Sequence, residues 1–117
     1  MILYHTADLM FATKIRSTAD ALELDASPVK DLEAFNKKAG AGGVRGLLVD
    51  LDSEVVGLSI LQAAAAEIPA ARKIAFGPHV NADLLERAAT MGADEVMPRS
   101  KFANELPQIL KSFASGG

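Results

Sequence analysis

Apolar residues in this chain occur in two patterns: short continuous runs, and longer stretches in which they recur every three or four positions. The short runs, each followed by polar or glycine residues, predict β-strands. The first strand lies at the N-terminus, and the run Gly-Leu-Leu-Val in the third has the continuous apolar character of a strand buried on both faces. The predicted strands are Met1–His5, Ala21–Ala26, Val44–Val49, Lys73–Phe76 and Glu95–Met97.

The longer stretches predict amphipathic helices, because a spacing of three or four residues places apolar side chains on one face of a helix. Local signals mark several ends: Ser27 is expected to cap a helix that begins at Pro28, and Asn81 to cap the fourth helix, which Gly92 ends. Ser53 precedes the third helix. The apolar positions of the five helices fall within Leu9–Leu22, Val29–Phe35, Val55–Leu61, Leu84–Met91 and Phe102–Phe113.

Strands and helices therefore alternate five times. Because crossovers between parallel strands are right-handed, this order predicts a parallel sheet with helices on both faces. The predicted fold is a three-layer (βα)5 α/β sandwich of the flavodoxin-like type, with strand order 2-1-3-4-5. Pro98 follows the last strand, which suits an edge position. In such folds ligands bind beyond the carboxyl ends of the strands.

Composition narrows the possibilities further. The 117 residues are 50% hydrophobic, enough for one domain (1–117), with residues 115–117 expected to form a flexible tail. The chain has no cysteine, which excludes a thiol nucleophile, a disulfide scaffold and thiolate zinc sites. Its net charge of −3, without a block of Lys and Arg, argues against binding nucleic acid by itself. We find no secretory signal and no apolar run of the roughly 20 residues that span a bilayer, and therefore expect a cytoplasmic protein.

Polar residues follow four of the predicted strands and are expected to meet at one edge of the sheet. The first strand is followed by Thr6, Ala7 and Asp8, and the third by Asp50, Leu51 and Asp52. The fourth and fifth strands add a Gly-Pro-His string and a cationic Arg-Ser pair. The candidate pocket therefore comprises Thr6, Asp8, Asp50, Asp52, Gly77, His79, Arg99 and Ser100.

Two strings within this arrangement carry a family resemblance. Gly46-Leu47-Leu48-Val49-Asp50 resembles the third strand of a receiver domain with its phospho-acceptor aspartate, and Ala88-Ala89-Thr90-Met91-Gly92-Ala93-Asp94-Glu95 resembles the receiver turn between the fourth helix and the fifth strand. Over essentially its whole length the chain resembles the receiver (CheY-like) domain of bacterial response regulators. The resemblance maps the phospho-acceptor onto Asp50.

The chain departs from the receiver pattern at most of the functional positions. Receivers carry two adjacent carboxylates after the first strand, where this chain has Thr6 and Ala7. The receiver Ser/Thr after the fourth strand is replaced by Gly77, the Lys-Pro after the fifth strand by Arg99-Ser100, and the aromatic switch residue by Val96. The resemblance is therefore to a divergent, or pseudo-, receiver.

This resemblance implies a non-enzymatic signalling or protein-interaction domain whose output does not depend on phosphorylation. In receivers the fourth helix, fifth strand and fifth helix form the face for partners and self-association, which maps onto Leu84–Met91 and Lys101–Phe113. One alternative is a receiver that accepts a phosphoryl group on Asp50 in a two-component phosphorelay, with Mg²⁺ held by Asp8, Asp50 and Asp52. A further alternative is an anion- or ligand-binding domain that uses Gly77–Asn81 with Arg99. No cofactor is expected otherwise.

Simpler structural roles compete with each of these candidate functions. Asp50 is expected to form an ion pair with Arg99 across the end of the sheet. His79 lies just before a predicted helix and is either a ligand contact or a solvated loop residue. His5, in the first strand, is expected to be a hydrogen-bonded core or edge residue.

Overall fold

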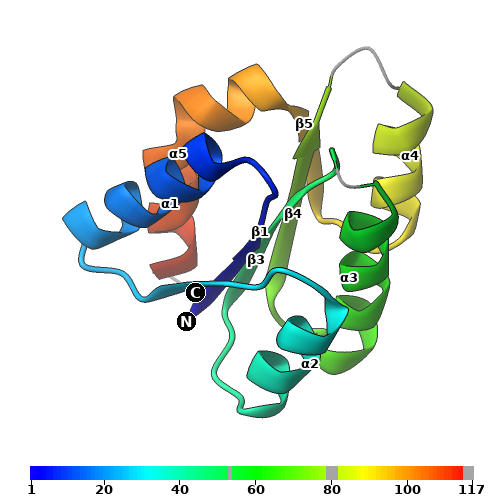
Figure 1. Cartoon of the computed structure of the whole chain (residues 1–117), viewed down its shortest axis with the longest axis horizontal. Helices are drawn as coiled ribbons and strands as arrows, with labels where there is room; N and C mark the ends of the chain where they lie inside the picture. The colour runs from blue at the N-terminus through cyan, green and yellow to red at the C-terminus, as the bar shows by residue number, and fades with distance from the viewer. Residues whose placement is uncertain (53, 79–81, 115–117) are drawn as a thin grey trace.

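Strands and helices alternate along the whole chain in the computed structural model, which describes residues 1–52, 54–78 and 82–114 (Figure 1). The strands are β1 (Ile2–His5), β2 (Ala26–Pro28), β3 (Gly46–Asp50), β4 (Arg72–Gly77) and β5 (Glu95–Pro98). The helices are α1 (Leu9–Ala21), α2 (Leu32–Gly40), α3 (Glu54–Glu67), α4 (Ala82–Thr90) and α5 (Arg99–Ala114).

All five strands are parallel and lie in the order β2-β1-β3-β4-β5, which confirms the predicted fold class. Strand β3 is central, and all five of its residues are buried. Strand β5 is an edge strand, where its last residue, Pro98, is opposite Gly77. The carboxyl ends of β1, β3, β4 and β5 consequently meet at one edge of the sheet, as parallel strands require.

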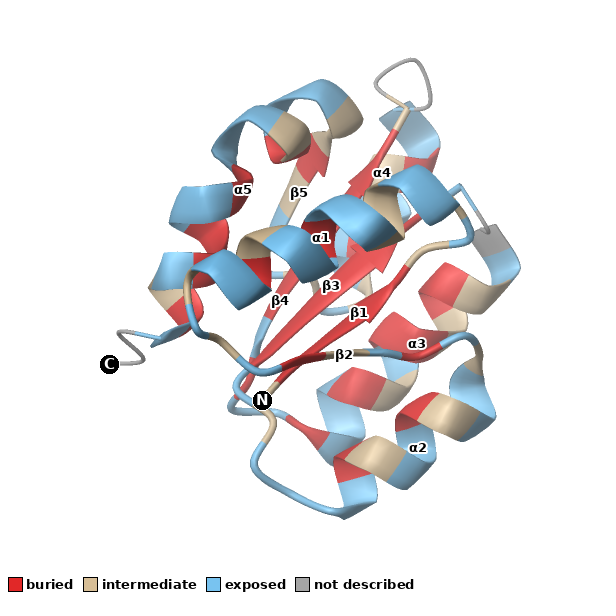
Figure 2. Ribbon diagram, turned by 60° about the vertical axis from the view of Figure 1, so that its left-hand side comes forward, coloured by how far each residue is buried: buried red, intermediate tan, exposed pale blue. Residues whose placement is uncertain are grey.

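Two layers of helices cover the sheet (Figures 1 and 2). Helices α1 and α5 pack on one face, over a core built around Ile15, Leu48, Phe76 and Phe102. Helices α2, α3 and α4 pack on the other face. Within the described residues, no helix is long and apolar enough to cross a membrane.

The second strand is where the sequence prediction was wrong. The predicted strand Ala21–Ala26 is instead the end of α1 and the turn after it, in which Glu23 adopts a positive φ of 58°. Leu22 and Leu24 turn back against the core beneath α1, which explains why their apolar character resembled a strand. The strand itself begins only at Ala26, because its pairing partner Ile2 lies opposite that residue.

The predicted start of the second helix was also wrong. Pro28 is the last residue of β2, so Ser27 caps no helix. Proline is tolerated there because β2 is an edge strand and the missing N–H breaks no ladder between two strands. The N-cap is Asp31, whose carboxylate accepts a hydrogen bond from the Ala34 N–H at 2.8 Å.

Of the other predicted helix ends, the one at Gly92 can be compared with the structure. Helix α4 does end at the glycine turn: Gly92 has a φ of 111°, and the N–H of Ala93 donates to the Ala88 carbonyl at 3.2 Å. The predicted caps at Ser53 and Asn81 lie outside the described residues.

Two buried residues, Gly46 and Lys73, lie near the amino ends of β3 and β4. Gly46 lies against the ring of Phe113, and a Cβ at this glycine would come within 2.7 Å of the ring carbons. Lys73 is buried, and its ammonium donates to the carbonyls of Ala71 at 2.8 Å and Pro69 at 3.4 Å, just beyond the end of α3. These carbonyls provide the hydrogen bonds that a buried cation requires.

Candidate functional site

Asp50 is the centre of the polar cluster at the carboxyl edge of the sheet. It is the last residue of β3 and is only 1% exposed. Its Oδ2 accepts a hydrogen bond from the hydroxyl of Thr6 at 2.7 Å, and its Oδ1 accepts one from the N–H of Asp52 at 3.0 Å. Nη2 of Arg99 lies 3.1 Å from the same Oδ1. Both carboxylate oxygens therefore have partners within the protein.

Arg99 links this aspartate to the surface. It is the first residue of α5, directly after β5, and the same Nη2 lies 2.9 Å from Oδ2 of the exposed Asp52. The hydrogen bond with Asp52 raises the pKa of Arg99 above its ordinary value. Burial, the next largest effect, lowers this pKa, and the charges of Asp50 and Asp52 raise it again. The guanidinium therefore stays charged and holds the two carboxylates together.

The far side of the Arg99 guanidinium faces an aromatic ring. Its central carbon lies 5.3 Å from the ring centroid of Phe11, within the range of a cation–π contact. Phe11 in turn stacks on Phe76, and Phe76 on Phe102, with centroids 5.5 Å and 3.8 Å apart. The Nε of Arg99 is buried without a hydrogen-bond partner among the described residues. Arg99 therefore joins α1, β3 and α5 at this edge.

Asp8 belongs to the same edge but acts on the helix behind it. Its Oδ1 accepts the N–H groups of Met10 at 2.8 Å and Phe11 at 3.3 Å, which makes it the N-cap of α1. Its own N–H donates to the Thr6 hydroxyl at 3.1 Å. The Thr6 hydroxyl thus accepts from Asp8 and donates to Asp50, and its orientation is fixed from both sides.

Gly77, at the position of the receiver serine or threonine, is closely surrounded by Leu51 and Leu85. Gly77 ends β4, and a Cβ placed on it would lie 3.2 Å from Cβ of Leu51 and 3.6 Å from Cδ2 of Leu85. Leu51 is completely buried and would have to shift by a few tenths of an ångström to admit a Cβ at this position. Ser100 lies exposed in the first turn of α5, and no hydrogen bond joins it to Asp50 within the described part of the chain.

The candidate pocket is therefore assembled in part. Thr6, Asp50, Asp52 and Arg99 form one network, and Asp8 touches it through Thr6. The sequence-based expectation of an Asp50–Arg99 ion pair agrees with the observed 3.1 Å contact. His79 lies outside the described residues, as do Val80 and Asn81 of the expected Gly77–Asn81 ligand loop.

His5 lies one residue before this network and is buried. Its Nδ1 donates to the carbonyl of Val29 at 2.9 Å, which fixes the proton on that nitrogen, since a carbonyl only accepts. Its Nε2 is buried without a partner among the described residues. The hydrogen-bonded core histidine expected from the sequence is what the structure contains.

Sequence reasoning missed two residues of this site. Phe11 receives the Arg99 guanidinium, and Leu51 fills the space beside Gly77. An aromatic residue in the first turn after Asp8 was the available signal for Phe11. Leu51 carried none, because an apolar residue between two aspartates does not indicate which face of the sheet it will occupy.

The fit of a divalent cation can be tested on the donor set. Mg²⁺ needs several oxygen ligands, and the three candidate carboxylates are Asp8, Asp50 and Asp52. Asp8 is directed at the amides of α1, and the other two share a guanidinium that repels a second cation. No group of three or more His, Cys, Asp or Glu side chains in the described ranges is placed to hold a metal ion. In this arrangement the residues do not fit Mg²⁺.

Similarity to solved structures defines the fold class. The receiver domain of NtrX from Brucella abortus superposes with a TM-score of 0.84 and 13% identity, over 100% of both chains. A response regulator from Thermotoga maritima gives a TM-score of 0.80 and 12% identity, over 97% of this chain and 96% of the other. The chain thus has the fold of a response regulator receiver (CheY-like) domain.

A third similar structure carries ligands. It is a response regulator protein from Burkholderia pseudomallei with a phosphorylated aspartic acid, calcium ion and citrate, at a TM-score of 0.79 and 20% identity, over 97% of this chain and 68% of that one. No protein-family model matches the chain, and no curated protein sequence does. At these identities the similarity is one of fold.

Proposed function

We propose that this chain is a receiver-type signalling and protein-interaction domain whose output does not depend on phosphorylation of Asp50. The observation that carries the proposal is the state of Asp50: it is 1% exposed, and both of its oxygens are bonded to Thr6, Asp52 and Arg99. A phospho-acceptor needs an oxygen free to attack an incoming phosphoryl group. Asp50 has none in this arrangement.

The positions around Asp50 support the same proposal. Thr6 and Ala7 replace the receiver's acidic pair, so the cation that would neutralise an incoming phosphoryl group has no carboxylate ligands there. Arg99 supplies a fixed positive charge within the protein instead. Gly77 offers no hydroxyl to contact a phosphoryl group, and a Cβ there would lie only 3.2 Å from Cβ of Leu51. These four positions together support the proposal of a pseudo-receiver that acts without enzymatic activity of its own.

The partner-binding part of the proposal rests on the fold. By resemblance to receivers, α4, β5 and α5 form the face for a protein partner or for self-association. Strand β5 is an edge strand, and Asp83, Glu86 and Arg87 of α4 are exposed beside it. A cytoplasmic location and the absence of direct nucleic-acid or membrane binding are part of this proposal.

The deciding experiment is intact-mass analysis after incubation with acetyl phosphate and Mg²⁺, alongside amide NMR spectra recorded with Mg²⁺ and then beryllofluoride. We expect no phosphoryl adduct and no shift at Asp50 or Arg99. A phosphorylation-competent receiver treated in parallel shows that the reagents are active. An adduct that appears in the wild type and disappears in Asp50→Asn would overturn the proposal and establish the Mg²⁺-dependent alternative.

A further inference from the structure

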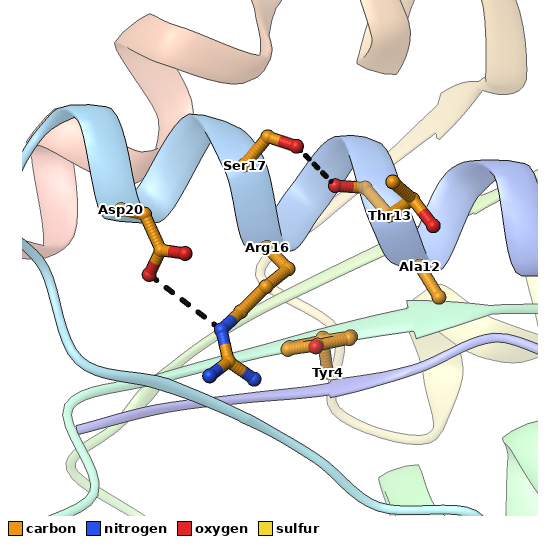
Figure 3. Close-up of a pocket in the computed structure, with 6 residues that line it drawn as sticks. All are labelled: Tyr4, Ala12, Thr13, Arg16, Ser17 and Asp20. Carbon is orange, nitrogen blue, oxygen red and sulfur yellow. Dashed lines mark hydrogen bonds and ion pairs between the residues drawn. The ribbon is translucent and has the colours of Figure 1, made fainter.

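A groove unrelated to the Asp50 network opens on the face of the sheet that α1 covers. It has a volume of about 510 Å³ and lies between α1 and the strand β1. Figure 3 shows its lining as sticks, with five residues from α1 above and one from β1 below. The lining residues are Tyr4, Ala12, Thr13, Arg16, Ser17 and Asp20.

Tyr4 brings a buried ring and an open hydroxyl to this groove. The residue is 3% exposed, and its hydroxyl reaches solvent and has no hydrogen-bond partner among the described residues. Because the ring is buried, the position of the hydroxyl at the groove is fixed. The groove is therefore the side from which a partner can reach this oxygen.

Arg16 adds a second set of donors. Its Nε lies 3.5 Å from Oδ1 of Asp20, one helical turn along α1, and both side chains are more than half exposed. Figure 3 shows the guanidinium extending from α1 toward the ring of Tyr4. Its two terminal nitrogens have no partner in the described part of the chain. A planar pair of N–H donors of this kind matches the two oxygens of a carboxylate or phosphate.

Two hydroxyls of α1 line the groove, and one of them has a hydrogen-bond partner within the helix. Ser17 donates to the carbonyl of Thr13 at 2.7 Å. The Thr13 hydroxyl has no partner within residues 1–52, 54–78 and 82–114. Ala12 and the Tyr4 ring provide the apolar part of the lining. The groups without partners are thus a guanidinium edge and two hydroxyls, all able to donate.

We propose that this groove binds a small ligand bearing an oxyanion, either a carboxylate or a phosphate, between the terminal nitrogens of Arg16 and the hydroxyl of Tyr4. Asp20 balances the charge of Arg16 and engages its Nε edge, so recognition depends on directed hydrogen bonds at the other edge rather than on net positive charge. Thr13 is a third donor at the same opening. The groove does not include Asp50, so this proposal does not depend on whether Asp50 is phosphorylated.

The test is an amide NMR titration of the whole chain with inorganic phosphate and, separately, with acetate, at constant ionic strength. We expect saturable shifts at Thr13, Arg16 and Ser17, and at the Arg16 side-chain Nε–H, with at least one of the two anions. Arg16→Gln should raise the Kd about tenfold, and Tyr4→Phe about threefold, since each removes a donor to the ligand.

Arg72→Gln is the matched control, because Arg72 on β4 forms a half-exposed ion pair with Glu95 on the edge strand β5, away from the groove between α1 and β1. It should leave the Kd unchanged. The anion that saturates identifies the ligand as a carboxylate or a phosphate. Shifts that rise linearly to the highest concentration with both anions, or a Kd that Arg16→Gln leaves unaltered, would overturn the proposal.

Discussion

Nη2 of Arg99 lies 3.1 Å from Oδ1 of Asp50, so an arginine at the start of α5 neutralises a carboxylate buried at the end of the central strand. Removing one partner of a buried ion pair leaves the other charge uncompensated, which costs more than the pair itself contributes. The stability of the carboxyl edge of the sheet therefore depends on Arg99.

The first prediction concerns this arginine. Arg99→Gln should lower the free energy of unfolding by about 2 kcal/mol, because Asp50 stays buried while Arg99 is partly open to solvent. Urea unfolding followed by circular dichroism measures the change. Arg72→Gln, which breaks an exposed pair with Glu95, should cost less than about 1 kcal/mol. Equal losses in the two variants would show that the Asp50 pair has no special weight.

The second prediction concerns the other oxygen of Asp50. Thr6→Val keeps the shape of the side chain but removes the hydroxyl that donates to Oδ2, and should cost about 1–2 kcal/mol of unfolding free energy. The matched control is Thr18→Val, whose hydroxyl bonds the exposed carbonyl of Lys14 in the middle of α1. A loss at Thr6 no larger than at Thr18 would contradict the network described here.

The third prediction concerns the tight packing beside Gly77. Gly77→Ala should destabilise the protein by about 1–2 kcal/mol, because the added Cβ meets Cβ of Leu51 at 3.2 Å and a well-packed core resists overpacking. Gly40→Ala is the control, since a Cβ there meets nothing within 4 Å. If Gly77→Ala proves neutral while Gly40→Ala is also neutral, Leu51 does not exclude a side chain from this position.

The fourth prediction concerns alkaline pH. The folded pKa of Arg99 is raised, so its contribution to stability is complete below the unfolded pKa of arginine and is lost only as the pH rises through the folded one. The difference in unfolding free energy between wild type and Arg99→Gln should therefore stay constant from about pH 7 to about pH 10. An Arg99→Lys variant should begin to lose its advantage over Arg99→Gln as the pH rises above about 10.4, the ordinary pKa of lysine. Urea titrations at several pH values compare the three proteins.

The fold was predictable because its signal is periodic and repeated. Continuous apolar runs such as Gly46–Val49 alternate with stretches of helical spacing, and right-handed crossovers leave few topologies for that order. The predicted strand order places β5 at an edge, and Pro98 is compatible with that position. The second strand was predicted in the wrong place because it has only three residues and one buried position. Leu22 and Leu24 in the preceding turn gave the stronger apolar pattern.

The site was predictable only in outline. Residues that follow parallel strands must share an edge, which was enough to bring Asp50 and Arg99 together. Sequence could not give the degree of burial of Asp50, nor that Asp8 would cap α1 rather than face Asp50. Those outcomes depend on side-chain directions, which a chain-order argument does not determine. The contact between Arg99 and Phe11 could not be predicted for the same reason.

The buried Lys73 has a consequence for chemical labelling. Its ammonium donates to the carbonyls of Ala71 and Pro69, while lysines such as Lys37 and Lys101 are exposed. Amine-reactive reagents need the neutral, solvent-accessible amine, so Lys73 can react only when the end of α3 and the start of β4 open. Its rate of modification under native conditions, relative to that of the exposed lysines, therefore measures how often the structure opens locally at the amino end of β4.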